Sequence, residues 1–191
     1  MRFRLVYRGP LKSANSADSS DKHKIRKEFH RQLKELWQHR PLDEHKKLLR
    51  PRSTAADELT GLIKVVKDFQ FTPLVSDLFG WNTVAALDVL LLWTSPTGHV
   101  ITKGGDIDNR IKVLFDSLRM PEANEIPPSI TPGTDEKPFY VLLEDDKLVN
   151  SFSVSSDRLL REPNVKAEVE VIIQVNVGIT RGSMANLGIP Q

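Results

Sequence analysis

The stretch GGDIDNRIKVLFDSL (residues 104–118) places two glycines and two aspartates directly before an apolar pattern with helical spacing. An apolar residue recurs every three or four positions, which predicts an amphipathic helix over 108–118. Its apolar face would consist of Ile111, Leu114, Phe115 and Leu118. Upstream, TVAALDVLLLW (83–93) is almost entirely apolar and favours a buried central strand, with a helix as the other possibility.

The elements on either side of this pair predict an α+β fold. RFRLVY (2–7) alternates as a strand does, and residues 22–39 carry an apolar stripe that predicts a basic amphipathic helix. FYVLLEDDKLVNSFSV (139–154) is typical of a strand, an acidic turn and a second strand, and residues 167–177 alternate as a closing strand. The buried face of that closing strand would consist of Val169, Val171, Ile173, Val175 and Val177.

The chain as a whole is expected to form one α+β domain, a mixed sheet with helices packed on it, over residues 1–178. Residues 41–81 contain short apolar clusters that fit either strands or helical turns. The proline-rich residues 120–138 are expected to be an excursion or flap without regular structure. Residues 179–191 are expected to be a loosely held tail.

Composition excludes several classes of protein. The chain has 191 residues, 39% of them hydrophobic and 27% charged, and it has no cysteine, which rules out disulfides and thiolate chemistry. Its longest apolar run, residues 84–93, is too short to span a bilayer and contains Asp88. The first eight residues lack the apolar core of a signal peptide. We therefore expect a cytoplasmic protein with no membrane partner.

Charge is unevenly distributed along the chain. Residues 1–52 hold 15 Lys and Arg against 6 Asp and Glu, whereas the remainder holds 12 against 19. The first part is suited to a polyanion and the second to cations. Solvated helix faces are often charged, so this bias indicates a function only if the acidic part forms a metal site.

The aspartate pair itself has two interpretations. Asp106 and Asp108 are two residues apart, so on an extended backbone their side chains lie on one side. Aspartate is also favoured at a helix N-terminus, where it caps free N–H groups, and for an isolated pair this structural role is the simpler one. An EF-hand is excluded because its sixth and twelfth positions would be Ile111 and Ser117.

A second acidic cluster, Glu144-Asp145-Asp146, follows an apolar run in a distant part of the sequence. Carboxylates at the ends of separate elements commonly converge on Mg²⁺, which prefers oxygen ligands. Together with the basic helix, they predict metal-assisted attack on a phosphodiester, in which two ions about 4 Å apart activate water and stabilise the leaving oxygen.

The motif GGDIDNRIKVLFDSL followed by EDDKLV resembles the RusA-type Holliday-junction resolvases, which are crossover-junction endodeoxyribonucleases. Their signature is an aspartate pair, an asparagine, a lysine four residues after the second aspartate, and a later Asp-Asp turn. The resemblance is strong over residues 103–150 and weaker elsewhere. It implies a RusA-like fold, a Mg²⁺ cofactor in a site for one or two ions, a branched or four-way-junction DNA substrate and a homodimer, with no small-molecule cofactor.

The resemblance also implies roles for individual residues. Asp106, Asp108 and Asp146 would be catalytic metal ligands, with Asp145 as a further ligand. Lys112 would be the catalytic lysine, although an ion pair with Asp108 or Asp116 is the structural alternative. Asn109 would fix the turn. The cations expected to contact DNA are Lys12, Lys24, Arg26, Lys27, Arg31 and Lys103.

Other chemistries lack their motifs. The five histidines show no HxxxH or HExxH spacing, no serine sits in a nucleophile elbow, and Gly104-Gly105 belongs to no phosphate-binding loop. The alternative from another class is a non-catalytic DNA-binding or partner-binding protein that keeps the acidic turn as a scaffold. A third possibility is a structural accessory protein of a phage or mobile element without DNA affinity.

Overall fold

The computed structural model describes residues 1–52, 61–78, 80–94, 107–160 and 168–189. Its elements, in chain order, are β1 (Arg2–Pro10), α1 (Ser19–Leu36), the 3₁₀ helix η1 (Leu42–Leu48), β2 (Lys64–Val66), β3 (Phe69–Val75), β4 (Thr83–Trp93), α3 (Ile107–Leu118), the 3₁₀ turns η2 (Ala123–Glu125) and η3 (Thr134–Glu136), β5 (Phe139–Leu143), the 3₁₀ turn η4 (Asp146–Leu148), β6 (Val149–Arg158) and β7 (Glu168–Ile179).

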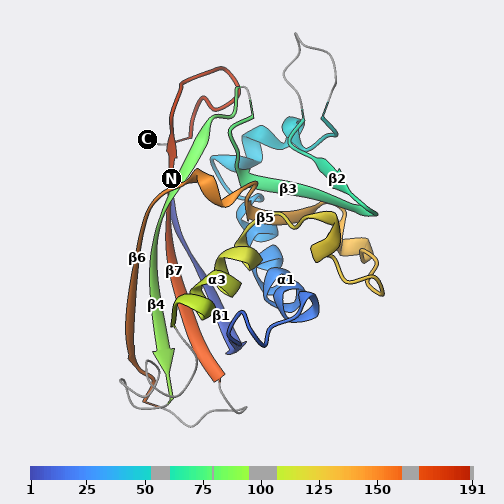
Figure 1. Ribbon diagram of the computed structural model, residues 1–191. Helices are drawn as coiled ribbons and strands as arrows, with labels where there is room; N and C mark the ends of the chain where they lie inside the picture. Colours follow the sequence, from blue (N-terminus) through green and yellow to red (C-terminus); the bar gives the residue numbers. More distant parts are fainter. Residues whose placement is uncertain (53–60, 79, 95–106, 161–167, 190–191) are drawn as a thin grey trace.

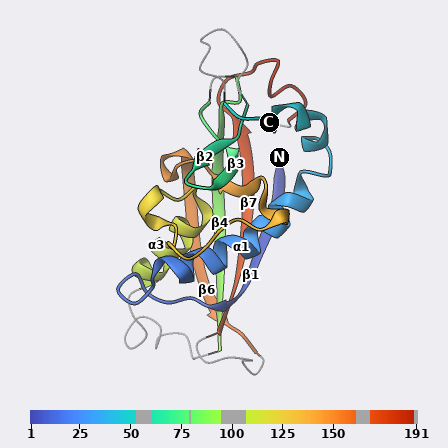
Figure 2. The same cartoon turned by 90° about the vertical axis from the view of Figure 1, so that its right-hand side faces the viewer.

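The strands form two mixed sheets. The larger has the order β1-β7-β4-β6, in which only the β4–β6 pair is parallel. The smaller has the order β2-β3-β5, in which β3 and β5 are parallel. Helices α1 and α3 and the smaller sheet lie on the same side of the larger sheet (Figures 1 and 2). The α+β class and the mixed sheet are therefore confirmed, whereas the second sheet is a feature that the sequence did not indicate.

Alternation along the strands decides which face of the larger sheet is buried. The predicted apolar face of β7 is confirmed, since its five Val and Ile residues are at most 3% exposed. Leu5 on β1 and Leu87 and Val89 on β4 lie in the same core. Helix α1 packs on this face through Ile25, Phe29 and Leu33, which confirms the predicted helical stripe. The strand interpretation of residues 83–93 is also confirmed.

Helix α1 is buried on more than its apolar stripe because it also contacts the smaller sheet. His23 lies against Phe69 and Phe139, and the Nδ1 atom of His30 accepts a hydrogen bond of 2.9 Å from the backbone N–H of Tyr140. All five residues of β5 are buried, since that strand lies between two hydrophobic clusters. Polar residues of α1 therefore lie in the interior.

Two segments pack more closely than the sequence suggested. Residues 120–138 form only short 3₁₀ turns, as expected, but Ile126 and Glu136 are buried and Lys27 forms an ion pair with Glu136 at 2.6 Å, so the segment is no free flap. Residues 180–189, expected to be a loose tail, make hydrogen bonds to the rest of the chain. Asn186 donates hydrogen bonds of 2.9 Å to the carbonyl oxygens of Trp81 and Arg181, and this pairing holds the segment despite its polar composition.

None of the helices formed by the described residues has the length and apolar composition needed to cross a bilayer.

The environment of His23 predicts a pH-dependent stability. Burial, followed by the charge of Arg26, lowers the pKa of His23 from the usual 6.5 to about 4. Between these values the unfolded chain takes up a proton that the folded chain does not, so the free energy of unfolding falls as the pH drops from 6.5 towards 4. The loss from this residue is at most about 3 kcal/mol.

We expect His23→Phe to lose less stability than the wild type between pH 7 and pH 5 in urea unfolding. The control is His39→Gln, at an exposed histidine, which should not reproduce the effect of His23→Phe. An equal loss in His23→Phe and wild type would show that His23 is not responsible.

Candidate active site

Helix α3 carries the second half of the aspartate motif. Asp108 lies in its first turn and Lys112 lies one turn further on, and both side chains are exposed. An aspartate in the first turn is stabilised by the positive end of the helix dipole. Asp106, Lys103 and Gly104-Gly105 lie outside the described residues.

The N-terminal end of α3 is fixed by contacts with two neighbouring segments. The backbone carbonyl of Asn109 accepts a hydrogen bond of 3.1 Å from the N–H of Ala14, in the loop that follows β1. The guanidinium of Arg110 lies 5.1 Å from the ring centroid of Trp93, at the end of β4, and donates to the carbonyl of Leu11. This bond involves the backbone of Asn109 alone, so the expected role of its side chain in fixing the turn stays a prediction.

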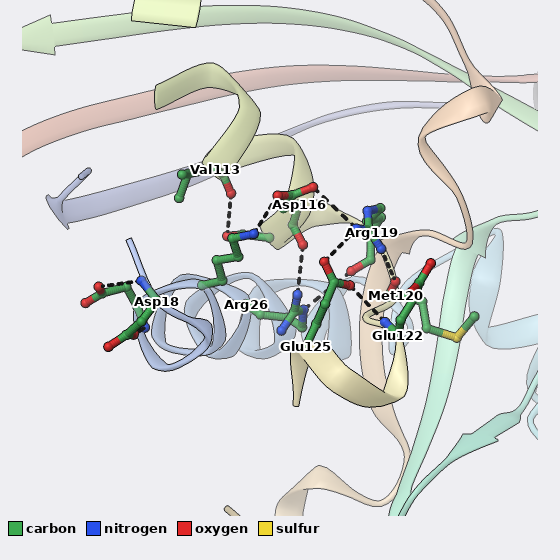
Figure 3. A network of polar contacts seen from close by, with 11 residues as sticks. Asp18, Arg26, Val113, Asp116, Arg119, Met120, Glu122 and Glu125 are labelled. Atoms are coloured by element: carbon green, nitrogen blue, oxygen red, sulfur yellow. Dashed lines mark hydrogen bonds and ion pairs between the residues drawn. The ribbon is translucent and has the colours of Figure 1, made fainter. Parts of the chain in front are cut away.

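The C-terminal end of α3 is held by a polar network that begins on α1 (Figure 3). Arg26 is 1% exposed and donates hydrogen bonds to the carbonyl oxygens of Asp116, at 2.8 Å, and Arg119, at 3.4 Å. The carboxylate of Asp116 pairs with Lys22 at 2.6 Å and with Arg119 at 3.4 Å, and Arg119 pairs with Glu125 at 2.8 Å. These bonds satisfy carbonyls that a helix end leaves free.

The placement of Arg26 corrects its expected role. The sequence assigned it to a surface face of the basic helix and to DNA contact, but its side chain is buried between α1 and α3. The reason is that α1 contacts other elements on two sides, so a position next to the apolar stripe is also covered.

The other expected DNA-binding cations that the structure describes lie at or near the surface. Lys24 and Arg31 are exposed, and Arg31 pairs with Glu28 on the same helix. Lys12 pairs with Asp21, and Lys27 is half-buried through its pair with Glu136. Since these ion pairs leave the side chains of Lys12, Lys27 and Arg31 between 42% and 64% exposed, they remain accessible to a phosphate backbone.

A backbone connection joins the end of α3 to the acidic turn. Arg119 forms a parallel bridge with Leu143, the last residue of β5, and the N–H of Met120 donates a hydrogen bond of 2.8 Å to the carbonyl of Leu143. Asp146 follows Leu143 by three residues. The C-terminal end of α3 and the acidic turn are therefore tied together three residues before Asp146, whereas Asp108 lies at the other end of the helix.

Asp108, Lys112 and Asp146 consequently line one open pocket of about 600 Å³. The remaining wall of this pocket is apolar and consists of Ile107, Ile111, Phe115, Phe152 and Val154. The predicted apolar face of α3 is thus divided: Leu114 and Leu118 are buried in the core, whereas Ile111 and Phe115 are half-buried at the pocket. The structure brings together three of the four predicted catalytic residues, and the fourth, Asp106, is outside the described residues.

The alternative role for Lys112 was an ion pair with Asp108 or Asp116, and the ion pairs among the described residues do not include it. Asp116 is paired with Lys22 and Arg119, and no ion pair within the described ranges joins Lys112 to Asp108 or Asp116. The ammonium of Lys112 is therefore available to a ligand in the pocket.

The three acids of the turn differ in their surroundings. Glu144 is held by Arg52, at 2.8 Å, and by the hydroxyl of Ser76. Burial raises the pKa of Glu144, but these two hydrogen bonds and the charges of Arg52 and Lys64 outweigh it and lower the pKa below 4.5. Glu144 is thus a structural residue, whereas Asp146 is exposed to the pocket.

Asp145 lies on the other side of the turn. One of its oxygens accepts a hydrogen bond of 3.0 Å from the N–H of Lys147 and caps η4. Its side chain lines a second pocket of about 510 Å³, which it shares with Asp146, Arg119 and Lys64. Asp145 therefore does not line the pocket of Asp108, whereas Asp146 borders both.

The donor set fits a divalent cation in part. Within the described ranges no group of three or more His, Asp or Glu is placed to hold a metal. Asp108 and Asp146 nevertheless present exposed carboxylates to one pocket, and carboxylate oxygens with water are the ligands that Mg²⁺ prefers. The third expected ligand, Asp106, precedes the first described residue of α3.

Comparison of the chain with protein-family models, with curated proteins and with solved structures found no match in any of the three. The resemblance of residues 103–150 to the RusA-type resolvases stays a prediction.

Sequence reasoning missed the apolar wall of the pocket. Phe152 is 60% exposed although it belongs to a strand, and its ring packs edge-on against Phe115 at 5.5 Å. The alternation SFSV (151–154) places Phe152 and Val154 on one face of the strand. No pattern in the sequence indicated that these two residues line a pocket outside the buried core.

The different surroundings of Glu144 and Asp146 predict that replacing each with its amide changes the stability of the fold by different amounts. Glu144→Gln should destabilise the fold by about 1–3 kcal/mol at pH 7, because Arg52 loses a charged partner. Since the folded pKa is lowered, this contribution is present above about pH 4.5 and is lost as the pH falls through the folded pKa.

Urea unfolding at pH 7 and below pH 4 measures this difference, which should shrink at the lower pH. Asp146→Asn, in the same turn but exposed, is the matched control and should change the stability by no more than about 0.5 kcal/mol. Equal destabilisation by both substitutions would contradict the division between a structural and a functional acid.

Proposed function

We propose that this protein is a Mg²⁺-dependent endonuclease that hydrolyses phosphodiester bonds in branched DNA. The observation that carries the proposal is the shared pocket of Asp108, Lys112 and Asp146, which come from α3 and from the turn after β5. Two carboxylates and one ammonium that are exposed in one pocket suit a phosphate and its cation. The motif resemblance supports a DNA junction as the substrate.

In this proposal Asp108 and Asp146 hold the ion, and Asp106 is the expected third ligand, with room for a second ion. Bound Mg²⁺ supplies Lewis-acid polarisation of the phosphate and lowers the pKa of water. Lys112, one turn after Asp108, directs its ammonium towards the non-bridging phosphate oxygens, where negative charge grows in the transition state. In the net reaction water adds to phosphorus, one P–O ester bond breaks, and the leaving oxygen gains a proton.

Lys12, Lys24, Lys27 and Arg31 would bind the duplex arms through phosphates. Such contacts give strong salt dependence and little base recognition. Because a four-way junction has two strands to cut, we infer that the active form is a homodimer with two sites.

The non-catalytic alternative is favoured by one observation, the lack of a complete metal-binding group among the described residues. A binding protein could keep Asp108 for its favourable position at the helix N-terminus. The two functions differ in what an Asp108 substitution does, because capping affects folding and metal binding affects cutting.

We expect the wild type to nick a labelled synthetic four-way junction in Mg²⁺ and not in EDTA. Asp108→Asn and Asp146→Asn should each reduce the cutting rate by at least about 100-fold, since each removes a metal ligand, and Lys112→Met should also reduce it. All three variants should retain junction binding in a gel-shift assay.

The matched control is Asp88→Asn. Asp88 is an exposed carboxylate on the opposite face of the larger sheet, and its partners Ser153 and Gln174 can also bond to an amide. Junction binding without cutting by the wild type in any divalent cation would favour the binding protein. Absence of salt-dependent DNA affinity would contradict both the nuclease and the DNA-binding protein and would favour a structural accessory protein.

A further inference from the structure

Phe152 is the large aromatic residue most exposed in the described part of the chain, and it lies beside the proposed catalytic groups. It belongs to β6, which forms an outer edge of the larger sheet (Figure 1), and it reaches Phe115 of α3. In the parallel register it lies opposite Leu87 of β4, so its ring is on the inner side of the sheet. Its ring packs against Phe115 in a T-shaped arrangement with the centroids 5.5 Å apart, and the residue is still 60% exposed.

A phosphate and a metal ion do not need an apolar wall, because both are strongly hydrated. The pocket nevertheless has five apolar residues beside its three charged ones. In a nucleic acid the apolar surface available to such a wall is the face of a base, and bases stack on aromatic side chains in proteins that bind single strands. The volume of about 600 Å³ falls in the range of small-molecule sites.

A second copy of this chain is a less suitable occupant. A protein surface that covered Phe152 would also cover Asp108, Lys112 and Asp146, and removing three charged side chains from water is costly. A nucleotide avoids this cost, because its base covers the apolar wall while its phosphate stays beside Lys112 and the carboxylates.

We propose that Phe152 stacks on an unpaired base of the nucleotide next to the scissile phosphate. This inference rests on the proposed function, since it places the phosphate of that nucleotide at Asp108, Lys112 and Asp146. A base inside a duplex is stacked on both faces, so it must leave the stack to reach the wall. The substrate must therefore offer an unpaired or easily unpaired nucleotide at the cut, as a branch point does.

The test uses junctions that carry the fluorescent base 2-aminopurine at single positions beside the branch point, because its emission rises when it leaves the duplex stack. Binding is measured with a chain that carries Asp108→Asn and Asp146→Asn, which prevents cutting and removes two negative charges from the pocket. Phe152→Ala, Phe152→Tyr and Val65→Ala are compared on this background. Val65 is the matched control, since it is 59% exposed on the other sheet.

We expect the emission to rise with the parent chain, with Phe152→Tyr and with Val65→Ala. Phe152→Ala should abolish the rise and weaken binding of junctions roughly tenfold. With the catalytic residues intact, Phe152→Ala should also slow cutting, whereas Val65→Ala should not.

An unchanged emission rise in Phe152→Ala would overturn the inference. So would a change from dimer to monomer on Phe152→Ala without an effect on the emission, because it would assign Phe152 to a contact between copies. If the emission depends on Phe152 but the wild type never cuts, the proposed nuclease fails and base binding stands. If the wild type cuts and the emission is independent of Phe152, only the base-stacking role fails.

Discussion

The hydrogen bond from the N–H of Met120 to the carbonyl of Leu143 is the constraint on which the proposed site depends. It joins Met120, two residues after the end of α3, to the last residue of β5, and so ties the helix that carries Asp108 and Lys112 to the turn that carries Asp146. Arg26 reinforces the connection from the opposite side by donating to two carbonyls at the end of α3. Without these contacts the two halves of the pocket would be separate features of the sequence.

The position of α1 between other elements explains why the interior contains so many polar groups. A helix that packs on one sheet buries one stripe, whereas α1 contacts the larger sheet, α3 and β5. His23, Arg26 and His30 are covered for this reason, and burial lowers the pKa of all three. The same helix thus supplies core packing with Ile25 and Phe29 and the polar support of α3 with Lys22 and Arg26.

Periodicity was sufficient to predict the elements whose environment is simple. Strand β7 and the apolar stripes of α1 and α3 follow from alternation or helical spacing, and β4 follows from its apolar run, because each buries its apolar positions in the core at least in part. Periodicity failed where a helix or strand is covered by other elements on more than one side. Arg26 was assigned to the surface because a helical pattern contains no information on a second packing partner, and residues 64–75 were ambiguous because β3 is buried on nearly every position. The candidate acids were indicated by motif and spacing, but Glu144 and Asp146 could be distinguished only by the contacts of Glu144 with Arg52 and Ser76.

The central claim is that Asp108 and Asp146 act on one cation, and a double-mutant cycle on Mn²⁺ affinity tests it most directly. Mn²⁺ takes the oxygen ligands that Mg²⁺ takes, and free and bound ion can be distinguished by electron paramagnetic resonance. If the carboxylates share an ion, Asp108→Asn and Asp146→Asn should each weaken binding by about 10-fold or more, and the double variant should be less affected than the product of the two single effects. Independent, multiplicative effects, or Mn²⁺ affinity that neither substitution changes, would contradict the account.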